Sequence, residues 1–195
     1  IEGFAGGYIY PFIWVLFGGV YLAYLSAGLI AGDIQSRTLD LTLSNPVSRE
    51  SVLAQKVAAL WVPILALNGA VVVTLALGAV ALGERLDIVA LAMVHLLGVP
   101  YLLVCAGIGV VFSVLFDRVG RAQVTSLGLV FVLWLVDGLS YTDPDYEWIG
   151  QFTPSRYYDP TGILVHGEYG FLDASLLLAA FVASLVVAAA IFVRR

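Results

Sequence analysis

The sequence predicts an all-α polytopic membrane protein, and its composition and the length of its apolar stretches lead to this prediction. Hydrophobic residues make up 61% of the 195 residues and charged residues 12%, whereas soluble proteins are about half apolar and about a quarter charged. The mean hydropathy is +0.99. The apolar stretches are long enough for helices, since a span needs about 20 residues to cross about 30 Å of hydrocarbon.

Five apolar stretches define the predicted spans, and together they form one transmembrane domain over residues 1–195. We predict spans at about residues 8–31, 53–82, 88–116, 123–140 and 172–193, a cytoplasmic loop at 32–52 and an outer interfacial segment at 141–171. The first stretch is not preceded by the basic residues of a secretory signal peptide. Because the chain starts at Ile1 and its only methionine is Met93, we expect one earlier helix, and therefore six spans in the complete chain.

Polar residues within the spans suggest contacts between helices. Asn68 follows Pro63 in the second span, a pattern that predicts a kink and a hydrogen bond to a neighbouring helix. His95 is expected to bond to another helix as well, in preference to forming a soft-metal site with Met93. Asp137 lies near the polar end of its span, so we expect it at the membrane interface, with a transport role as the alternative.

The segment from residue 141 to residue 171 combines many aromatic residues with acids, which is typical of chain lying at a membrane interface. Asp143-Pro144 and Asp159-Pro160 each place a capping acid before a proline, so a short helix is expected to start at each. His166 and Glu168 have no further ligands at a metal-binding spacing. We therefore interpret that pair as part of an exposed turn.

The distribution of charge predicts the orientation of the spans. Seven of the nine basic residues fall in or beside alternate connections, namely Arg37, Arg49, Lys56, Arg118, Arg121, Arg194 and Arg195. The positive-inside rule then places residues 32–52 and the carboxyl terminus in the cytoplasm of a cell membrane. The net charge is −5, and this acidity, with a single lysine, indicates an organism that lives in high salt, which we take to be a halophilic archaeon.

The loop after the first span is the most polar part of the chain, and two local structures fit it. Residues 38–44 alternate polar and apolar like a strand, but the leucines and Ile34 also fit helical spacing. We favour a short amphipathic helix on the inner membrane surface, ended by Asn45-Pro46. Ser48 is placed to cap the helix that follows.

The residues of this loop also carry a family resemblance. The run Ala-Gly-Asp-Ile-Gln-Ser-Arg-Thr-Leu-Asp-Leu-Thr-Leu-Ser-Asn-Pro-Val-Ser-Arg over residues 31–49, followed by Lys56, resembles the cytoplasmic signature of ABC-2 type transporter permeases. Two positions depart from that signature, because Arg37 and Gln55 stand where the family usually has glycine. Residues 154–160 and 192–195 also resemble the family, and the likeness is greatest to the exporter group that includes the nitrous oxide reductase maturation permease.

The resemblance implies the membrane subunit of an ATP-driven exporter, which pairs with a second permease copy and with cytoplasmic P-loop ATPase subunits. The chain has no Gly-x-x-x-x-Gly-Lys-Ser/Thr motif, so ATP and Mg²⁺ would bind the partner and no catalytic, cofactor or metal residues are expected here. No nucleic acid partner is expected. The residues implied to couple the subunit to its ATPase are Asp33, Arg37, Thr38, Leu39, Asp40, Leu41, Pro46, Arg49 and Glu50.

An intramembrane enzyme or a non-transporting scaffold is the alternative. An enzyme requires catalytic groups that converge in or near the bilayer. The polar residues within the spans, Asn68, His95, Cys105 and Asp137, are spread over three of them and match neither Gly-x-Ser-x-Gly nor His-Glu-x-x-His. The loop at residues 32–52 therefore leads the functional interpretation.

Overall fold

The computed structural model describes residues 2–194, apart from residues 40–43, 45 and 85. It confirms the predicted all-α fold with five long apolar helices, each long enough to cross a membrane. These candidate spans are Ala5–Gln35, Arg49–Leu82, Ile88–Leu115, Val119–Ser140 and Phe171–Arg194. Their lengths and apolar composition agree with the sequence prediction.

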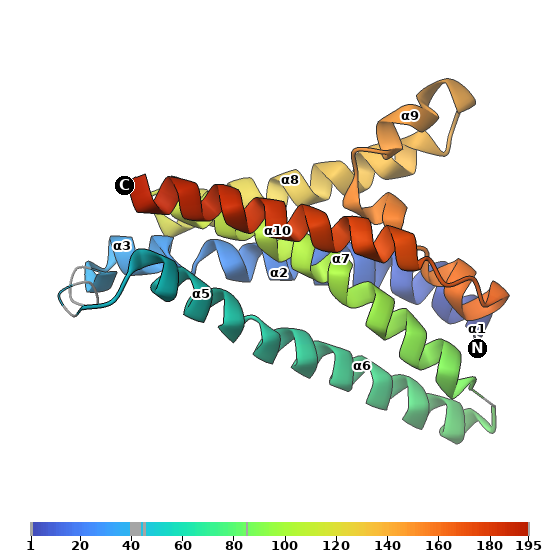
Figure 1. The fold of residues 1–195 in the computed structure, drawn as a ribbon. Coiled ribbons are helices and arrows are strands. Elements are labelled where there is room, and N and C mark those ends of the chain that lie inside the picture. Colours follow the sequence, from blue (N-terminus) through green and yellow to red (C-terminus); the bar gives the residue numbers. More distant parts are fainter. Residues whose placement is uncertain (1, 40–43, 45, 85, 195) are drawn as a thin grey trace.

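The helices follow one another in the order shown in Figure 1. The short helix α1 (Glu2–Phe4) precedes the first span, which is built from the π-helical η1 (Ala5–Gly18), α2 (Gly19–Ala27) and α3 (Ala31–Gln35). The later spans are α5 (Arg49–Ala59) with α6 (Trp61–Leu82), then α7 (Ile88–Leu115), α8 (Val119–Ser140) and α10 (Phe171–Arg194). Between α8 and α10 lie the short helices η2 (Pro144–Tyr146), α9 (Glu147–Gly150), η3 (Pro154–Tyr157) and η4 (Gly162–His166).

Helix α7 is the central element of the bundle and packs against α2, α8 and α10. Two of its glycines allow this close packing. A Cβ atom on Gly109 would collide with Ser26 and with the backbone oxygen of Ala23 on α2, and one on Gly107 would collide with Ser184 on α10. Because residues two apart point to opposite sides of a helix, this pair admits one neighbour on each side of α7.

The second span consists of two helices separated at Leu60. Pro63 lies in the first turn of α6, where its missing N–H leaves the carbonyl of Ala59 without its helical donor. The predicted interruption by Pro63 is thus present. Helix α6 diverges from the rest of the bundle along its length (Figure 1), so its polar contacts to α7 matter for its position.

The two ends of the bundle differ in charge and in structure. We call one end, with α3, the start of α5, residues 116–121 and the end of α10, the basic end. We call the other, with residues 83–84, 86–87 and 141–171, the acidic end. The short helices of residues 141–171 all lie at the acidic end (Figure 1).

Local capping agrees with the sequence prediction at three helix starts. The Oγ atom of Ser48 accepts a hydrogen bond from the Ser51 N–H at 3.1 Å and so caps α5. Asp143 accepts one from the Asp145 N–H at 2.9 Å at the start of η2. Asp159 accepts two, from Thr161 and Gly162, both at 3.0 Å. Each cap satisfies backbone donors that a helix start leaves free.

Candidate functional site

The helix α3, at the basic end, is joined to the central helix by a single serine. The backbone runs through a turn at residues 28–30 before α3 begins, and there the Ile30 and Ala31 N–H groups donate to Ser113 Oγ of α7 at 2.8 and 3.1 Å. Ser113, Ile30 and Ala31 are all buried. One hydroxyl thus satisfies two buried backbone donors and holds the start of α3 against α7.

Side chains of α3 also contact the helices on either side of it. The Gln35 Oε1 atom accepts a hydrogen bond from the Val119 N–H, at the first residue of α8, at 2.9 Å. The Asp33 carboxylate forms an ion pair with Lys56 of α5 at 2.7 Å. Both partners of the ion pair are only partly exposed, at 24% and 35%, so it is screened less than a pair in open solvent.

The start of α5 is in turn attached to the last span. The Arg49 guanidinium donates to the backbone oxygen of Phe192 on α10 at 3.3 Å and lies 5.4 Å from the centre of the Phe192 ring. A carbonyl near a helix carboxyl terminus is a favourable partner for a cation. Arg49 therefore connects the loop to α10.

The chain leaves α3 through a left-handed residue. Arg37 has a φ of 60°, a conformation that favours glycine because it costs any residue with a Cβ about 1–2 kcal/mol. The Ser36 and Thr38 hydroxyls on either side lie 2.9 Å apart, and Thr38 donates to an Asp33 side-chain oxygen at 3.3 Å. Arg37 is the position where the family resemblance led us to expect glycine, and the backbone conformation gives that expectation a physical reason.

The nine residues implied to couple to an ATPase occupy three kinds of position. Arg37, Thr38, Pro46 and Glu50 are exposed. Asp33, Leu39 and Arg49 face the protein: Leu39 is buried, and the other two pair with Lys56 and Phe192. Asp40 and Leu41 lie outside the described residues. The amphipathic helix favoured for residues 38–44 falls largely on that undescribed stretch.

Two of the polar residues inside the spans, Asn68 and His95, form a cluster with Tyr10, and each bonds to another helix as predicted. The Nδ1 atom of His95 lies 2.9 Å from Oδ1 of Asn68 on α6, and its Nε2 atom lies 2.8 Å from the Tyr10 hydroxyl on η1. Cys105 is buried on α7 beside Tyr101. The cluster therefore joins three helices through hydrogen bonds.

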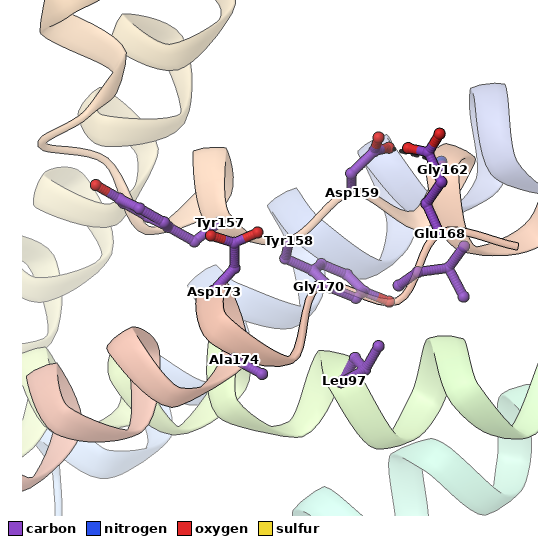
Figure 2. Close-up of a pocket in the computed structure, with 10 residues that line it drawn as sticks. Leu97, Tyr157, Tyr158, Asp159, Gly162, Glu168, Gly170, Asp173 and Ala174 are labelled. Carbon is purple, nitrogen blue, oxygen red and sulfur yellow. Dashed lines mark hydrogen bonds between the residues drawn. The ribbon is translucent and has the colours of Figure 1, made fainter. Parts of the chain in front are cut away.

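The acidic end contains a small cavity lined by carboxylates. Asp159, Glu168 and Asp173 line a space of about 170 Å³, and Figure 2 shows the Asp159 and Glu168 carboxylates turned toward each other near Gly162. His166 is exposed, as expected for a turn, and the next residue, Gly167, has a φ of 68°. Among the residues that the structure describes, no three His, Cys, Asp or Glu side chains are arranged to hold a metal ion.

Tyr158 attaches the acidic end to the bundle. Its hydroxyl donates to the Val94 carbonyl of α7 at 2.9 Å, and its ring stacks on Tyr101 with 5.8 Å between centroids. Burial raises the pKa of the Tyr158 phenol well above its usual value, because the charged phenolate would lose its hydration. Sequence reasoning placed Tyr158 in an aromatic and acidic interfacial segment and in the family-like stretch 154–160, but did not predict its contact with α7.

Asp137, which we expected at the membrane interface, lies near the end of α8 with its side chain buried. It is only 7% exposed. The cause is α9, whose Gly150 packs on Ser140 and Asp137 so closely that a Cβ atom there would lie 2.5 Å from Ser140 Oγ. The local sequence does not indicate that Asp137 is buried, because residues 150–156 come to lie over α8 only in the tertiary structure.

Sequence reasoning also missed three contact residues at the basic end. Gln35 bonds to Val119, and Ser113 and Phe192 bond to the loop. Gln35 and Phe192 lie in the family-like stretches 31–49 and 192–195 without having been assigned these contacts, and Ser113 lies in no recognisable motif. Small polar residues in apolar spans often bond between helices, and that is the only signal that could have indicated Ser113.

The fold and these contacts define a polytopic helical membrane protein whose first loop is tied to most of its spans. The chain belongs to the ABC-2 family transporter proteins, since the model of that family matches residues 5–142. It is thus a membrane component of an ABC-2 transporter. Neither a curated protein nor a solved structure matches the chain.

Proposed function

We propose that the chain is the permease subunit of an ATP-driven exporter and that a cytoplasmic P-loop ATPase docks on residues 31–50. The observation that carries this proposal is the attachment of α3 and the start of α5 to the other spans. Ser113 links the segment to α7, Gln35 links it to α8, and Arg49 links it to α10. A force on the segment would reach three helices directly, without passing through lipid.

Each of these links is suited to transmit movement. The Ser113 bonds are buried and the Arg49 bond is partly buried. Such bonds are costly to break without replacement, so α7 and α10 are expected to move with the segment, while the bond from Gln35 to α8 is exposed. The Asp33–Lys56 ion pair adds a fourth link, from α3 to α5. This ion pair therefore holds α3 and α5 together as one unit, as a mechanical coupling element requires.

The exposed part of the segment offers a polar docking surface. Arg37, Thr38, Pro46 and Glu50 are exposed, and a recess of about 290 Å³ lies between α3 and α5, lined by Asp33, Thr38, Val52, Gln55 and Lys56. Charged rims set orientation and partner choice in protein interfaces. Arg37 and Glu50, with opposite charges, are the residues most suited to contact the ATPase.

The remaining parts of the proposal follow from the family and from charge. The positive-inside bias favours a cytoplasmic position for the basic end, where ATP is available. ATP and Mg²⁺ would bind the partner ATPase, and a second permease copy would complete the transporter. The motifs at residues 154–160 and 192–195 favour the exporter group that includes the nitrous oxide reductase maturation permease, and the acidic composition favours a halophilic source.

Affinity purification from the native membrane tests the proposal. The full-length protein should retain a P-loop ATPase, detectable by photolabelling with azido-ATP. The double variant Arg37→Glu/Glu50→Lys should reduce the retained ATPase by about tenfold, since it opposes two charges at the interface. Asp145→Lys, at an exposed acid of the acidic end, is the matched control and should retain it fully.

Two results would contradict the proposal. One is a purified protein that carries no P-loop ATPase under any condition that preserves the membrane complex. The other is full retention of the ATPase by the double variant, which would exclude docking at Arg37 and Glu50. A folded variant is recognised by an unchanged thermal midpoint in detergent.

A further inference from the structure

An apolar crevice lies between α8 and α10, with α7 as its floor. Its volume is about 430 Å³. Both helices pack against α7, but they have little contact with each other and separate toward the acidic end (Figure 1). None of the described residues that line the crevice carries a carboxylate or a basic side chain, which distinguishes it from the carboxylate-lined cavity.

The walls of the crevice come from the apolar faces of three spans. Its lining within the spans consists of Val104 and Ile108 of α7, Leu133 of α8, and Leu176, Leu177, Ala180 and Ser184 of α10. Residues four apart lie on the same face of a helix, so Ala180 and Ser184 are neighbours on α10. Their small side chains leave the space that larger residues would fill.

The hydroxyl groups that line the crevice already use their hydrogen atoms within the protein. Each donates to a backbone carbonyl of its own segment: Ser184 to Phe181 at 2.6 Å, Thr153 to Gly150 at 2.7 Å and Tyr157 to Gln151 at 2.8 Å. The lining therefore presents mainly hydrocarbon to an occupant, and a polar ligand would lose its water without gaining these donors.

One end of the crevice is closed by the segment that follows α9. Residues 151–154 and Tyr157 form this roof at the acidic end. Phe152 is 75% exposed and Trp148 is 60% exposed, and their rings meet edge to face with 6.3 Å between centroids. Exposed aromatic residues favour the headgroup level of a bilayer. The roof therefore corresponds to the membrane interface, and the walls below it lie at the depth of the hydrocarbon.

The crevice is open to the bilayer along its side. Leu176 and Ala180 are exposed on α10, whereas Val104 on the floor is only 7% exposed. Apolar cavities do not hold water stably. An empty crevice would lose the dispersion contacts of its walls. Hydrocarbon from the surrounding lipid supplies those contacts, because it already touches the opening.

The dimensions favour a single lipid chain over a helix of a second copy. A helix with its side chains is about 10–12 Å wide and would have to continue past the roof to cross the membrane. A space of about 430 Å³ instead falls in the range of about 300–1,000 Å³ that holds small molecules. A slender chain can enter from the side and end below residues 151–154.

We propose that this crevice, which we call the acyl-chain site, binds one acyl chain of a bilayer phospholipid. The chain lies along α10 at Leu176 and Ala180 and contacts Val104 and Ile108 on the floor. The lipid headgroup lies at the level of the roof. The acyl-chain site does not depend on the proposed ATPase docking, because its lining shares no residue with the segment 31–50.

Photo-crosslinking in proteoliposomes tests the acyl-chain site. The full-length protein is reconstituted with a phospholipid that carries a photoreactive diazirine in one acyl chain, and labelled residues are identified by mass spectrometry. Val104 and Ile108 should be labelled although they lie on the floor. Val110, fully buried elsewhere on α7, should remain unlabelled. Leu178, exposed on α10 outside the crevice, reports general contact with lipid.

Two pairs of variants block the crevice or leave it open. Ala180→Phe fills it, and Ala179→Phe places the same side chain on an exposed neighbour that does not line it. Leu176→Trp narrows the opening, and Leu178→Trp is its control, since the two leucines are 48% and 42% exposed. The blocking variants should lose the label at the floor, and the controls should keep it. Unchanged thermal midpoints identify the folded variants, and the second pair replaces the first if Ala180→Phe does not fold.

Two results would overturn the acyl-chain site. One is labelling of Leu178 without labelling of Val104 and Ile108, which would mean that a second copy or another part of the protein fills the crevice. The other is full labelling of the floor in a folded blocking variant. Retention of the ATPase is measured separately and does not change with either result, so failure of this site is distinguishable from failure of the proposed coupling.

Discussion

The Nδ1 atom of His95 donates a hydrogen bond to the Asn68 Oδ1 atom at 2.9 Å, and this bond ties α6 to α7. The direction follows from the partners. The Asn68 Nδ2 group already donates to the Ile64 carbonyl at 2.8 Å, which leaves its oxygen as an acceptor. His95 Nε2 then accepts from the Tyr10 hydroxyl at 2.8 Å, so the neutral tautomer with the proton on Nδ1 satisfies every partner.

Replacing Asn68 is therefore expected to release α6. Asn68→Leu leaves the His95 Nδ1–H without an acceptor and should cost about 0.6–2 kcal/mol of stability, the range for hydrogen bonds between membrane helices. Disulfide cross-linking between engineered cysteines on α6 and α7 would report the loosening. Thr74→Ala is the control, because the Thr74 hydroxyl bonds to Ala70 within α6 and to no other described residue, and cross-linking should be unaffected by it.

The packing of α2 on α7 should depend on Gly109. A Cβ atom there would collide with a backbone oxygen of α2, which cannot rotate away as a side chain can. Gly109→Ala is expected to destabilise the protein by about 1–3 kcal/mol through overpacking, seen as a lower thermal midpoint. Gly128→Ala on α8, where nothing lies within 4 Å, should leave the midpoint unchanged or raise it. Equal midpoints for the two variants would contradict this account of the interface.

Ser113 should control the local stability of α3. Ser113→Ala leaves the Ile30 and Ala31 N–H groups buried without a partner, which costs about 1–3 kcal/mol. Hydrogen exchange at these two amides should accelerate while exchange in the middle of α7 stays slow. Ser175→Ala removes a hydroxyl whose partner among the described residues is Leu172, within α10, and serves as the comparison. Unchanged exchange at Ile30 would show that the serine does not hold the junction.

The effect of the left-handed backbone conformation of Arg37 can be measured separately from the effect of its side-chain charge. Arg37→Gly should preserve or raise stability, by up to about 1 kcal/mol, because glycine adopts a positive φ without the Cβ penalty. Arg37→Val should lower the thermal midpoint, since a β-branched residue is disfavoured there. If the charge matters for docking, both variants lose ATPase affinity but only Arg37→Val loses stability. A glycine variant less stable than the valine variant would refute the turn argument.

Some features of this protein follow from local sequence. The five spans depend on runs of apolar residues, and the caps at Ser48, Asp143 and Asp159 involve partners two or three positions away. The break before α6 follows from one proline. Such features form wherever the same short stretch occurs, so reading the sequence in order is enough to predict them.

Pairing between distant residues could be predicted only in part. The sequence indicated that Asn68 and His95 each need a partner, because unpartnered polar groups are unfavourable in lipid. That they bond to each other depends on how α6 crosses α7. Ser113 was not identified, because its partners lie 82 and 83 positions away and its own surroundings look like any apolar span.

The sequence by itself determined the membrane class, the five spans and the polar loop between the first two, since these depend on composition and on neighbouring residues. Only the tertiary structure decided that Asp137 is buried beside Ser155 and Arg156, and that the loop is tied to α7, α8 and α10. The physical reason is that burial and hydrogen bonding depend on which helices touch. Which helices touch is decided by close contacts such as those of Gly109 of α7 with α2 and of Gly150 of α9 with α8. Local sequence does not reveal these contacts.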